Sequence, residues 1–371
     1  MASVAKYLPI LQILEADIAA GKYLNGKRLP SENELAQRFK VSRPTAGRAI
    51  RELVNLGLIE RRAGSGTFLR PSRQAQSAQR TIGLIVPGLG NTEILDPICS
   101  EITRFAQAHH TAVLWGDPST QQRASTAEQA TQLCQFYIQQ RVSGVFFAPI
   151  EIGSDRQRIN LEIASALSSA GIAITLLDRD VLDFPGRSNF DRVGIDNFIA
   201  GFTLASHLIS LGHRRLGFLA RPDHPSTTDL RLAGCRQAAA SHGLPHGAPL
   251  FFSAVPTDVR YIREMLAANP LDAMICSNDL TAALLMQTLT TSPGLTLPRD
   301  LAIAGFDDVN YSTLLSVPLT TMHQPFRAIA QAAVDTLLAR IEDPTLPPRQ
   351  VLLSAELIVR KSCGAPEAIP T

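Results

Sequence analysis

The stretch Leu29–Leu69 restricts the possible folds of this chain more than any other part of its sequence. Ser31 and Glu34 have the spacing of a capping box, so a helix is predicted to begin there and to run to about Phe39. Residues 7–20 have the apolar spacing of an amphipathic helix and are expected to pack against it. The beginning of the chain therefore predicts a pair of short helices.

A further helix is predicted directly after this pair. Ser42 can cap its N-terminus, Pro44 is tolerated in its first turn, and Gly57 is expected to end it. One face carries apolar side chains at helical spacing, which predicts that it is buried: Ala49, Ile50, Leu53 and Leu56. Two short helices joined by a tight turn, of which the second begins with Ser-Arg, form a helix-turn-helix.

The segment after this helix has the pattern of a β-hairpin. Residues 58–62 and 67–69 flank the turn Gly64-Ser65-Gly66. A hairpin that directly follows a helix-turn-helix is a wing, and its glycines allow the backbone to come close to the minor groove of DNA. The sequence therefore predicts a winged helix-turn-helix, an α+β head, over residues 1–70.

The distribution of charge suits a polyanionic partner for this head alone. Residues 1–80 hold 14 Lys and Arg and 6 Asp and Glu, whereas residues 81–371 hold 21 and 27. The basic N-terminal part is therefore suited to bind a polyanion, and the acidic remainder is not. The motif, and not the charge, is what points to DNA.

The head resembles the DNA-binding domain of the GntR family of bacterial transcription regulators over about residues 4–70. The spacing of Leu29-Pro30-Ser31-Glu32, Val41-Ser42-Arg43 and the wing carries the resemblance. At Asn33 and Gly47, where many members have arginine, the sequence departs from the family, so no operator sequence follows from it. The resemblance implies contacts with double-stranded operator DNA by Ser31, Asn33, Ser42, Arg43, Pro44, Thr45, Arg48, Arg62, Gly64, Ser65 and Gly66.

The chain is too long for one hydrophobic core, so two or three domains are predicted. Residues 71–80, with Arg70 before them, are rich in Ser, Gln, Ala and Arg and have the composition of a linker. We expect a DNA-binding domain over 1–70, this linker, an effector-binding and dimerisation domain over 81–362, and a tail over 363–371.

From Thr81 onward, short apolar strands alternate with helices, which predicts an α/β domain with parallel sheets. The expected strands are Ile82–Val86, Ala112–Trp115, Gly144–Phe147, Ala173–Leu177, Val193–Ile195, Leu216–Ala220, Ala273–Cys276 and Leu301–Ala304. In doubly wound sheets, ligands bind beyond the carboxyl ends of the strands. The polar residues that follow the strands are therefore the candidate site.

Several such residues stand at strand ends: Asp178, Arg179, Arg231, Asn278, Asp307 and Gln324. Carboxylates, guanidinium groups and amides that converge on one cleft suit a polyhydroxylated ligand, because each hydroxyl can donate to Asp and accept from Arg or Asn. Taken singly, each residue can equally be a cap, a turn residue or a surface charge. Asp279 and Asp308 are the two most easily explained in that way.

Residues 81–362 resemble the LacI-type regulators and the periplasmic sugar-binding proteins. The matching motifs include Leu177-Asp178-Arg179, Val193-Gly194-Ile195-Asp196-Asn197, Arg231-Leu232-Ala233-Gly234, Ser277-Asn278-Asp279, Gly305-Phe306-Asp307-Asp308 and Pro318-Leu319-Thr320-Thr321. The resemblance implies two Rossmann-like lobes with parallel sheets, three chain crossings between them and an effector in the cleft. It also implies effector contacts by Asn91, Glu93, Asp178, Arg179, Arg231, Asn278, Phe306, Asp307 and Gln324.

One departure from the sugar-binding relatives concerns the stacking of a sugar ring. Ribose-type binders have two aromatic residues where this chain has Glu93 and Ile94, which suits a more polar or cationic ligand than a pentose. Phe251, Phe252 and Phe306 remain candidate stacking surfaces.

Nothing in the sequence indicates a membrane protein, a secreted protein or an enzyme. No apolar run approaches a membrane span, and residues 1–10 lack the shape of a signal peptide, so a cytoplasmic protein is expected. The five cysteines have no metal or redox spacing, and no nucleophile–base pair or histidine cluster appears. We therefore expect no cofactor, no metal and no catalysis, and we disfavour a secreted solute-binding protein.

These observations predict a ligand-responsive transcriptional regulator, a repressor that a sugar or sugar derivative releases from its operator. The order of the two parts is similar to that of arabinose repressors. A homodimer is expected, because so small a head makes few contacts and a two-fold operator needs two. Two alternatives remain open: an effector that is a purine or a phosphorylated sugar, and a regulator that activates.

Overall fold

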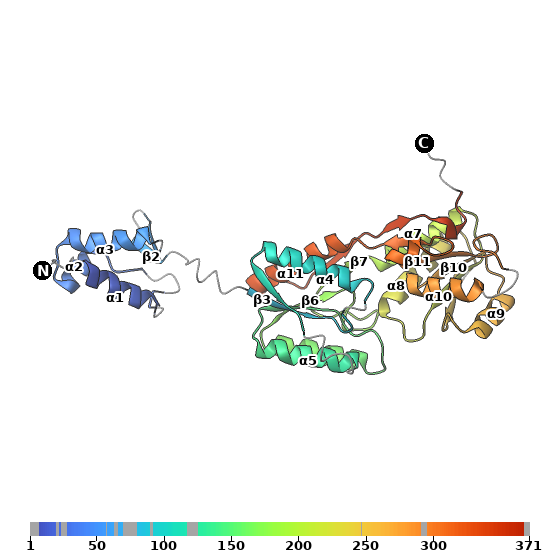
Figure 1. Cartoon of the computed structure of the whole chain (residues 1–371), viewed down its shortest axis with the longest axis horizontal. Helices are drawn as coiled ribbons and strands as arrows, with labels where there is room; N and C mark the ends of the chain where they lie inside the picture. Colours follow the sequence, from blue (N-terminus) through green and yellow to red (C-terminus); the bar gives the residue numbers. More distant parts are fainter. Residues whose placement is uncertain are drawn as a thin grey trace. The chain divides into compact units, whose positions relative to one another are not determined.

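The computed structural model describes residues 7–19, 22–23, 28–56, 58–62, 66–69, 80–89, 92–116, 125–245, 247–290 and 295–366. The chain divides into two compact units, residues 1–79 and 80–371 (Figure 1). Most of the predicted linker and the end of the predicted tail lie outside the described residues. Among the described residues, no helix is long and apolar enough to cross a membrane.

The N-terminal unit is a helix-turn-helix with a wing. It consists of α1 (Leu8–Ala19), α2 (Glu32–Phe39), α3 (Arg43–Asn55), β1 (Ile59–Arg62) and β2 (Gly66–Leu69). The two strands pair antiparallel, and the backbone N–H of Leu29 donates to the carbonyl of Thr67 at 2.9 Å. Apolar side chains from all three helices form one core, among them Ile10, Leu14, Leu35, Ala49, Ile50 and Leu53. The predicted helix-turn-helix is confirmed. The predicted burial of Leu56 is wrong, because α3 ends at Asn55 and Leu56 is 57% exposed.

The two predicted caps differ in their outcome. The backbone N–H of Ser31 donates to Glu34 Oε2 at 2.6 Å, and the Ser31 hydroxyl accepts from the Glu34 backbone N–H at 3.3 Å, so the capping box is present. Ser42 precedes α3, but its hydroxyl makes no bond to the helix backbone. It lies instead 2.8 Å from the hydroxyl of Thr45, so Ser42 is the N-cap residue as predicted but makes no side-chain capping bond.

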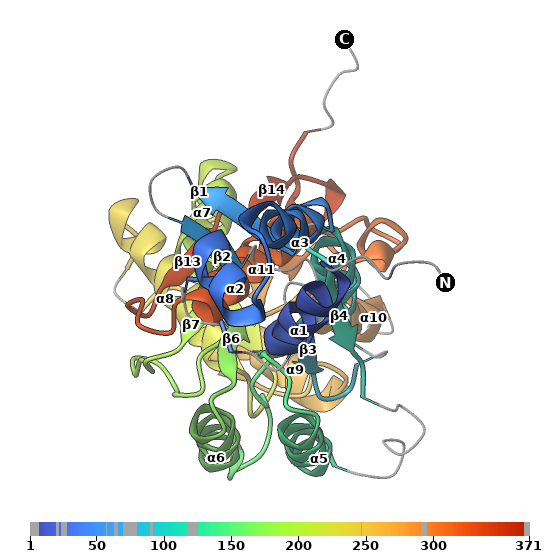
Figure 2. The same ribbon diagram turned by 90° about the vertical axis from the view of Figure 1, so that its left-hand side faces the viewer.

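The second unit consists of two lobes, each with a six-stranded sheet. Lobe 1 has the order β13-β7-β6-β5-β3-β4, and all its neighbouring strands are parallel. The helices α4 (Leu95–Ala108) and α11 (Phe326–Glu342) cover one face, and α5 (Thr126–Gln139) and α6 (Arg156–Ser169) cover the other (Figure 2). The strands are β3 (Arg80–Ile85), β4 (Thr111–Leu114), β5 (Gly144–Phe147), β6 (Ala173–Leu177), β7 (Asp191–Ile195) and β13 (Gln350–Leu353).

Lobe 2 repeats this plan in the order β14-β12-β11-β10-β8-β9, with only β14 antiparallel to its neighbour. The helices α7 (Asn197–Ser210) and α8 (Ser226–Ser241) cover one face, and α9 (Val259–Ala268) and α10 (Asp279–Thr290) cover the other. The strands are β8 (Leu216–Ala220), β9 (Leu250–Ser253), β10 (Ala273–Cys276), β11 (Ala302–Asp307), β12 (Thr320–His323) and β14 (Glu356–Ile358). Two short 3-10 helices, η2 (Asn310–Thr313) and η3 (Lys361–Cys363), complete the lobe.

Alternation along the strands places apolar side chains on both faces of each sheet. In β3, Ile82 and Leu84 pack with α4 and α11, whereas Ile85 packs with α5 and α6. Buried side chains of α4, α11, α7 and α8 belong to one continuous core that extends through both lobes. The predicted α/β fold with two Rossmann-like lobes is therefore confirmed.

The chain passes between the lobes three times, as predicted. The crossings follow β7 at Asp196, β12 at residues 324–325 and β13 at residues 354–355. Four strands are absent from the predicted set: β9, β12, β13 and β14. They are short, and three of them are edge strands with mixed exposure, so they lack the continuous apolar run that identifies a central strand.

Candidate functional site

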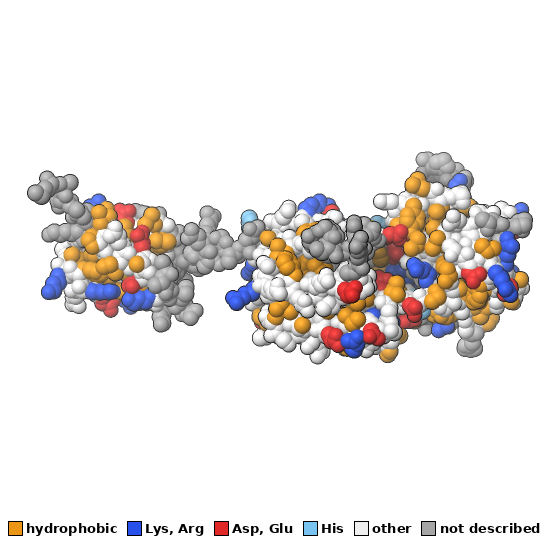
Figure 3. All heavy atoms as spheres, turned by 60° about the horizontal axis from the view of Figure 1, so that its bottom comes forward, with side chains coloured by type: hydrophobic (Ala, Val, Ile, Leu, Met, Phe, Trp, Pro, Cys, Tyr) orange, Lys and Arg blue, Asp and Glu red, His pale blue; other side chains and the backbone are white. Residues whose placement is uncertain are grey.

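A cavity of about 90 Å³, which we call the cleft, lies between the two lobes at the carboxyl ends of β6, β8, β10 and β11. Figure 3 shows acidic and basic side chains at the hollow between the lobes. This is the end of a doubly wound sheet at which ligands bind. Lobe 1 contributes Ile94, Glu151, Ile152, Asp178 and Arg179, and the polar residues of lobe 2 include Asp223, His224, Thr228, Arg231, Asn278 and Asp307.

The lobe-1 side is an ion-paired cluster that follows β6. Arg179 donates from Nε and Nη2 to Asp178 Oδ2 at 3.2 and 2.8 Å, and from Nη1 to the carbonyl of Pro149 at 3.0 Å. Its guanidinium also pairs with Glu151. Burial by itself would raise the pKa of Asp178, but the adjacent guanidinium of Arg179 outweighs it and holds that pKa below its ordinary value. Asp178 is therefore an ionised hydrogen-bond acceptor.

The backbone around Asp178 explains why its neighbour in β7 is a glycine. Asp178 has a φ of 67°, and its N–H donates to the carbonyl of Val193 at 2.8 Å. A Cβ on Gly194 would lie 3.1 Å from the Cα and carbonyl oxygen of Asp178. The close approach of β7 thus holds Asp178 in the turn that aims it at the cleft.

Arg231 enters the cleft from α8 because two helices approach each other unusually closely. A Cβ on Gly201 in α7 would lie 2.0 Å from the carbonyl oxygen of Arg231, and one on Gly234 would lie 1.9 Å from that of Phe198. No other residue fits at either position. The two glycines therefore bring the start of α8 against the start of α7, beside the first crossing between the lobes.

The guanidinium of Arg231 joins four parts of lobe 2. It donates to Asn197 Oδ1 at 2.8 Å, to the carbonyl of Ser277 at 2.6 Å and to Asp307 Oδ1 at 3.2 Å. It also lies 4.6 Å from the ring centroid of Phe306, a favourable cation–π distance. Three of the five N–H donors are used in these bonds, so the others remain for the oxygens of a ligand.

Asp307 is the most buried carboxylate of the cleft. Burial raises its pKa to about 6, although Arg231 and Gln324 both act to lower it. Gln324, in the second crossing, donates to Asp307 Oδ1 at 2.8 Å. Asn197, Arg231, Asp307 and Gln324 thus form a hydrogen-bonded chain, which we call the crossing network, from the first crossing through the cleft to the second.

Asn278 lines the cleft and also caps a helix. Its Oδ1 accepts from the backbone N–H of Thr281 at 2.9 Å. Asp279 and Asp308 are structural, as expected: Asp279 accepts from the Thr321 hydroxyl at 2.6 Å and the Val309 N–H at 3.1 Å, and Asp308 pairs with Arg360 at 2.6 Å. A position at the end of a strand therefore does not by itself distinguish Asn278, which lines the cleft, from Asp279 and Asp308, which are structural.

Several residues predicted to contact an effector lie beside the cleft and do not line it. Phe306 is fully buried beneath Arg231, and Gln324 is buried behind Asp307. Glu93 accepts a hydrogen bond from the Tyr311 hydroxyl of lobe 2 at 2.8 Å. Asn91 lies outside the described residues. Direct effector contact by these four residues stays a prediction.

The proposed stacking surfaces Phe251 and Phe252 are residues of the edge strand β9 and are not among the side chains that line the cleft. Phe251 packs instead against His224, with ring centroids 5.7 Å apart. His224, Asp223, Thr228 and Glu151 line the cleft and were not singled out from the sequence. All of them lie at or after the ends of β5 and β8. The expectation that ligands bind beyond the carboxyl ends of strands would have identified them if it had been applied to every strand.

In the N-terminal unit, the side chains predicted to contact DNA differ in their exposure and in their contacts with the rest of the unit. The side chain of Arg43 is 70% exposed and approaches Glu32 to 3.5 Å. Arg48 is exposed and lies 4.4 Å from the ring centroid of Tyr7. A Cβ on Gly47 would lie 3.2 Å from the carboxyl group of Glu32, so this glycine allows α2 and α3 to approach. Gly64, Ser65 and the side chain of Arg62 lie outside the described residues.

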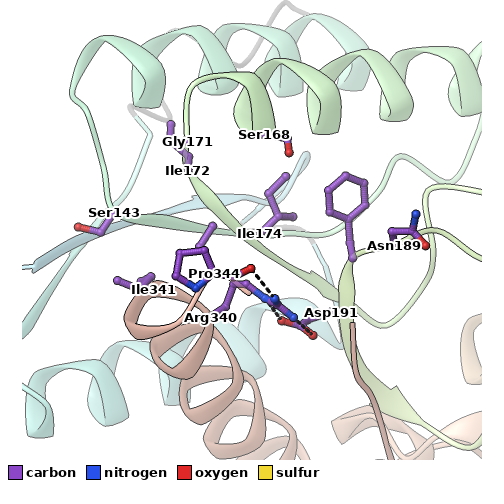
Figure 4. Close-up of a pocket in the computed structure, with 12 residues that line it drawn as sticks. Ser143, Ser168, Gly171, Ile172, Ile174, Asn189, Asp191, Arg340, Ile341 and Pro344 are labelled. Atoms are coloured by element: carbon purple, nitrogen blue, oxygen red, sulfur yellow. Dashed lines mark hydrogen bonds and ion pairs between the residues drawn. The ribbon is translucent and has the colours of Figure 1, made fainter. Parts of the chain in front are cut away.

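A larger cavity, of about 420 Å³, opens at the opposite end of the lobe-1 sheet (Figure 4). Arg340 lies at its base and donates to Asp191 at 2.9 and 3.1 Å. Its other donors bond the carbonyls of Pro344, Leu346 and Pro347, so all five N–H groups are used. This cavity therefore offers a ligand no free guanidinium donor, in contrast to the cleft. Among the described residues, no cluster of His, Cys, Asp or Glu is arranged to hold a metal ion.

Comparison with protein families finds a match in each unit. The model of the gntR family of bacterial regulatory proteins matches residues 6–69. The model of the periplasmic binding protein-like domain matches residues 205–363. The two matches follow one another along the chain. The first corresponds to the helix-turn-helix and its wing, and the second to most of lobe 2, the second and third crossings, and α11 and β13 of lobe 1.

One similar protein matches over both units, and two solved structures match over about three quarters of the chain. The arabinose metabolism transcriptional repressor of Geobacillus stearothermophilus is 28% identical over 97% of this chain and 98% of its own length. The crystal structure of the transcription regulator GntR of Chromobacterium violaceum is 28% identical, with a TM-score of 0.59, over 77% of this chain and 100% of that one. A LacI family regulator of Enterococcus faecium with bound ribose has a TM-score of 0.61 at 22% identity, over 76% of this chain and 98% of that one, and it shares the fold. These relatives are regulators and not enzymes.

Proposed function

Because the chain is a transcriptional regulator that joins a GntR-type DNA-binding domain to a periplasmic binding protein-like effector domain, we propose that a neutral sugar bound in the cleft releases it from operator DNA. The observation that carries this proposal is the set of buried, ion-paired side chains that face one another across the cleft. Asp178 and Arg179 come from lobe 1, and Arg231 and Asp307 come from lobe 2. Carboxylates and guanidinium groups together can bind both the donor and the acceptor of each sugar hydroxyl.

The charges of the cleft favour a neutral polyol over a phosphorylated sugar. Its lining holds four carboxylates (Glu151, Asp178, Asp223 and Asp307) and three guanidinium groups (Arg179, Arg221 and Arg231). Both buried arginines already have carboxylate partners. A phosphate would therefore meet one carboxylate more than there are guanidinium groups, and both buried guanidinium groups are already paired, which disfavours its binding.

The lining also argues against a purine. No Phe, Tyr or Trp is among the described residues that line the cleft, and the imidazole of His224, which does line it, packs against Phe251. A planar base is commonly stacked on such rings, whereas a sugar bound through its hydroxyls needs none of them. The name of the Geobacillus relative and the ribose bound to the Enterococcus relative agree with a sugar.

The crossing network supplies a route by which effector binding can be transmitted. A sugar held between Asp178 and Arg231 favours the conformation in which the lobes are close together. Arg231 and Asp307 are bonded to Asn197 and Gln324, which lie at the first and second crossings. We infer that a change in the angle between the lobes alters the spacing of two DNA-binding domains in a homodimer.

Homodimerisation is part of this proposal, and β9 with the beginning of α9 is the surface that we assign to it. This edge of lobe 2 exposes five large apolar side chains: Leu250, Phe251, Val255, Val259 and Tyr261. Exposed apolar side chains beside an open sheet edge are typical of surfaces that another chain covers. Val255→Asp should convert a dimer into a monomer in sedimentation equilibrium, and an unchanged mass would refute this choice of surface.

The proposed function is tested by a DNA-binding titration with the full-length protein. An operator is first selected from a random duplex library, and release is then measured by fluorescence anisotropy with L-arabinose, D-ribose, D-galactose and D-glucose. At least one sugar should weaken binding, whereas AMP and ribose 5-phosphate should not. Release by the phosphorylated compounds alone would contradict the neutral-sugar proposal.

The same assay tests the DNA-binding domain. Arg43→Ala should weaken operator binding by about 1–3 kcal/mol, since Arg43 opens the helix that reads the major groove. Lys22→Ala removes an equal charge from the loop after α1, where Lys22 pairs with Asp17, and serves as the control. Equal effects of the two substitutions would mean that Arg43 contributes only its charge.

A further inference from the structure

A second cavity, which we call the annex, adjoins the cleft within lobe 1. It has a volume of about 200 Å³. Its apolar lining comes from the loops after β3 and β5 and from the start of α4: Pro87, Leu95, Ala148, Pro149, Ile150 and Ile152. The annex is therefore larger than the cleft, and all the residues that line it belong to lobe 1.

The annex and the cleft are adjacent and share part of their lining. Glu151, Ile152 and Arg179 line both of them. The ion pair of Arg179 with Glu151 marks the boundary, with the polar groups for a sugar on one side and apolar side chains on the other. A single ligand that extends past this ion pair would occupy both spaces.

The backbone of the loop after β5 offers this ligand few polar atoms. The N–H of Ala148 donates to the carbonyl of Ile85 at 2.9 Å, and the carbonyl of Pro149 accepts from Arg179. Both polar groups of Ile150 bond the buried side chain of Asn160, at 2.8 and 3.1 Å. Three of the four polar side chains that line the annex are also bonded already: the Thr92 hydroxyl donates to Asp96 Oδ1 at 2.6 Å, and Arg179 pairs with Glu151. A hydroxyl placed in the annex would therefore find few partners and would lose its bonds to water, which costs free energy.

Ile152 gives an independent indication of what covers the annex. Its side chain lies at the junction of the two cavities and is 55% exposed. An apolar group that covers it would remove apolar surface from water on both molecules. The chemistry of the annex thus matches a hydrocarbon substituent and does not match a second sugar ring.

We infer that the effector is a glycoside, with its sugar hydroxyls in the cleft and an aryl or branched alkyl substituent in the annex. This inference rests on the proposed sugar effector and specifies its class. Burial of a substituent of that size should lower the concentration that releases DNA by about ten- to a hundredfold relative to the free sugar.

The test compares free sugars with their phenyl glycosides on the full-length protein. L-Arabinose, D-ribose, D-galactose and D-glucose are titrated beside both anomers of their phenyl glycosides, with operator release and thermal stability as readouts. At least one phenyl glycoside should act at a concentration ten times lower than its parent sugar. Phenol alone should have no effect, since it lacks the hydroxyls for the cleft.

Two matched variants localise the effect. Thr126 is exposed at the start of α5 and lines the annex but not the cleft. Thr126→Trp should obstruct the annex and remove the advantage of the glycoside, while the response to the free sugar stays unchanged. Thr131→Trp introduces the same side chain at an exposed position of α5 that lines neither cavity, and it should behave as wild type.

The possible failures are distinguishable. If free sugars act and every phenyl glycoside is weaker, the annex is not a subsite, but the proposed sugar effector stands. If Thr126→Trp weakens the free sugar and the glycoside equally, the annex does not select a substituent and the inference is overturned. If neither free sugars nor glycosides act, the proposed function and the inference both fall.

Discussion

The two lobes hold their sides of the cleft in different ways. In lobe 1, Asp178, Arg179 and Glu151 are bonded to one another and to Pro149, all within loops of the same lobe. In lobe 2, Arg231 and Asp307 are bonded to each other and also to Asn197 and Gln324, which lie at the crossings. Lobe 1 therefore offers an anchored surface, whereas lobe 2 offers a surface connected to the segments that must move when the lobes move.

This difference suggests that the two lobes have different roles in effector binding. A ligand bound to lobe 1 alone gains affinity but does not change the crossings. Contact with the crossing network is what makes its affinity differ between conformations, and only such a difference can shift the equilibrium. Substitutions in lobe 2 should thus impair the response more than equivalent substitutions in lobe 1.

Asp307→Ala should have the largest effect. It removes the carboxylate that pairs with Arg231 and accepts from Gln324, at a cost of about 1.5–3 kcal/mol. The effector concentration needed for release should rise by about ten- to a hundredfold or more, with operator binding nearly unchanged because the DNA-binding domain is a separate unit. Loss of operator binding itself would mean that Asp307 is structural.

Asp178→Asn should have a smaller effect. Arg179 keeps Glu151 as a partner, and asparagine tolerates the positive φ of this position. We expect about a tenfold weaker affinity by isothermal titration, with the maximal extent of DNA release retained. A variant that binds ligand normally but no longer releases DNA would reverse the roles that we assign to the two lobes.

The pH dependence of binding should come from lobe 2. The pKa of Asp307 is about 6, whereas that of Asp178 lies below its ordinary value. Effector affinity should therefore fall several-fold as the pH falls from 7.5 to 5, because protonation of Asp307 removes an acceptor. Asp307→Asn should reduce this dependence, and the remainder should come from His224, which lines the cleft and whose pKa is raised by its hydrogen bond with Asp229. An undiminished pH effect in Asp307→Asn would exclude Asp307 as its source.

A loss of folding stability caused by protonation of Asp307 cannot explain the lower effector affinity at pH 5. The pKa of Asp307 in the folded protein lies above its ordinary value of 3.8, so the folded state binds more protons than the unfolded state between those two values. The contribution of Asp307 to stability therefore increases as the pH falls through 6. Melting curves at both pH values provide the check.

The bond between Tyr311 and Glu93 should have the smallest effect, although it joins the two lobes directly. It lies between partly or fully exposed side chains, so water can replace it at little cost. Tyr311→Phe and Glu93→Gln should each shift the effector concentration for release by about two- to fivefold. The double variant should show no further shift if the two residues act as a pair.

Local patterns in the sequence predicted most elements of this fold. The capping box at Ser31 and Glu34 and the apolar spacing in α3 depend on residues within a few positions of one another. The central strands were predictable because burial on both faces requires a continuous apolar run, as in Ala273–Cys276. Ser42 is also the N-cap residue that the sequence predicts, but its hydroxyl contacts the hydroxyl of Thr45 and not a backbone N–H of the helix.

The sequence by itself determined that this chain has a basic helix-turn-helix followed by an α/β domain, because both follow from short-range spacing and composition. Only the tertiary structure decided which strand-end residues line the cleft, which lie behind it and which are caps. Arg231 meets Asp307 across 76 positions of sequence, and it does so because two glycines let α7 and α8 approach to a distance that no other residue allows. The annex depends in the same way on loops after β3 and β5 that meet only when the sheet has formed, so no local pattern could have predicted it.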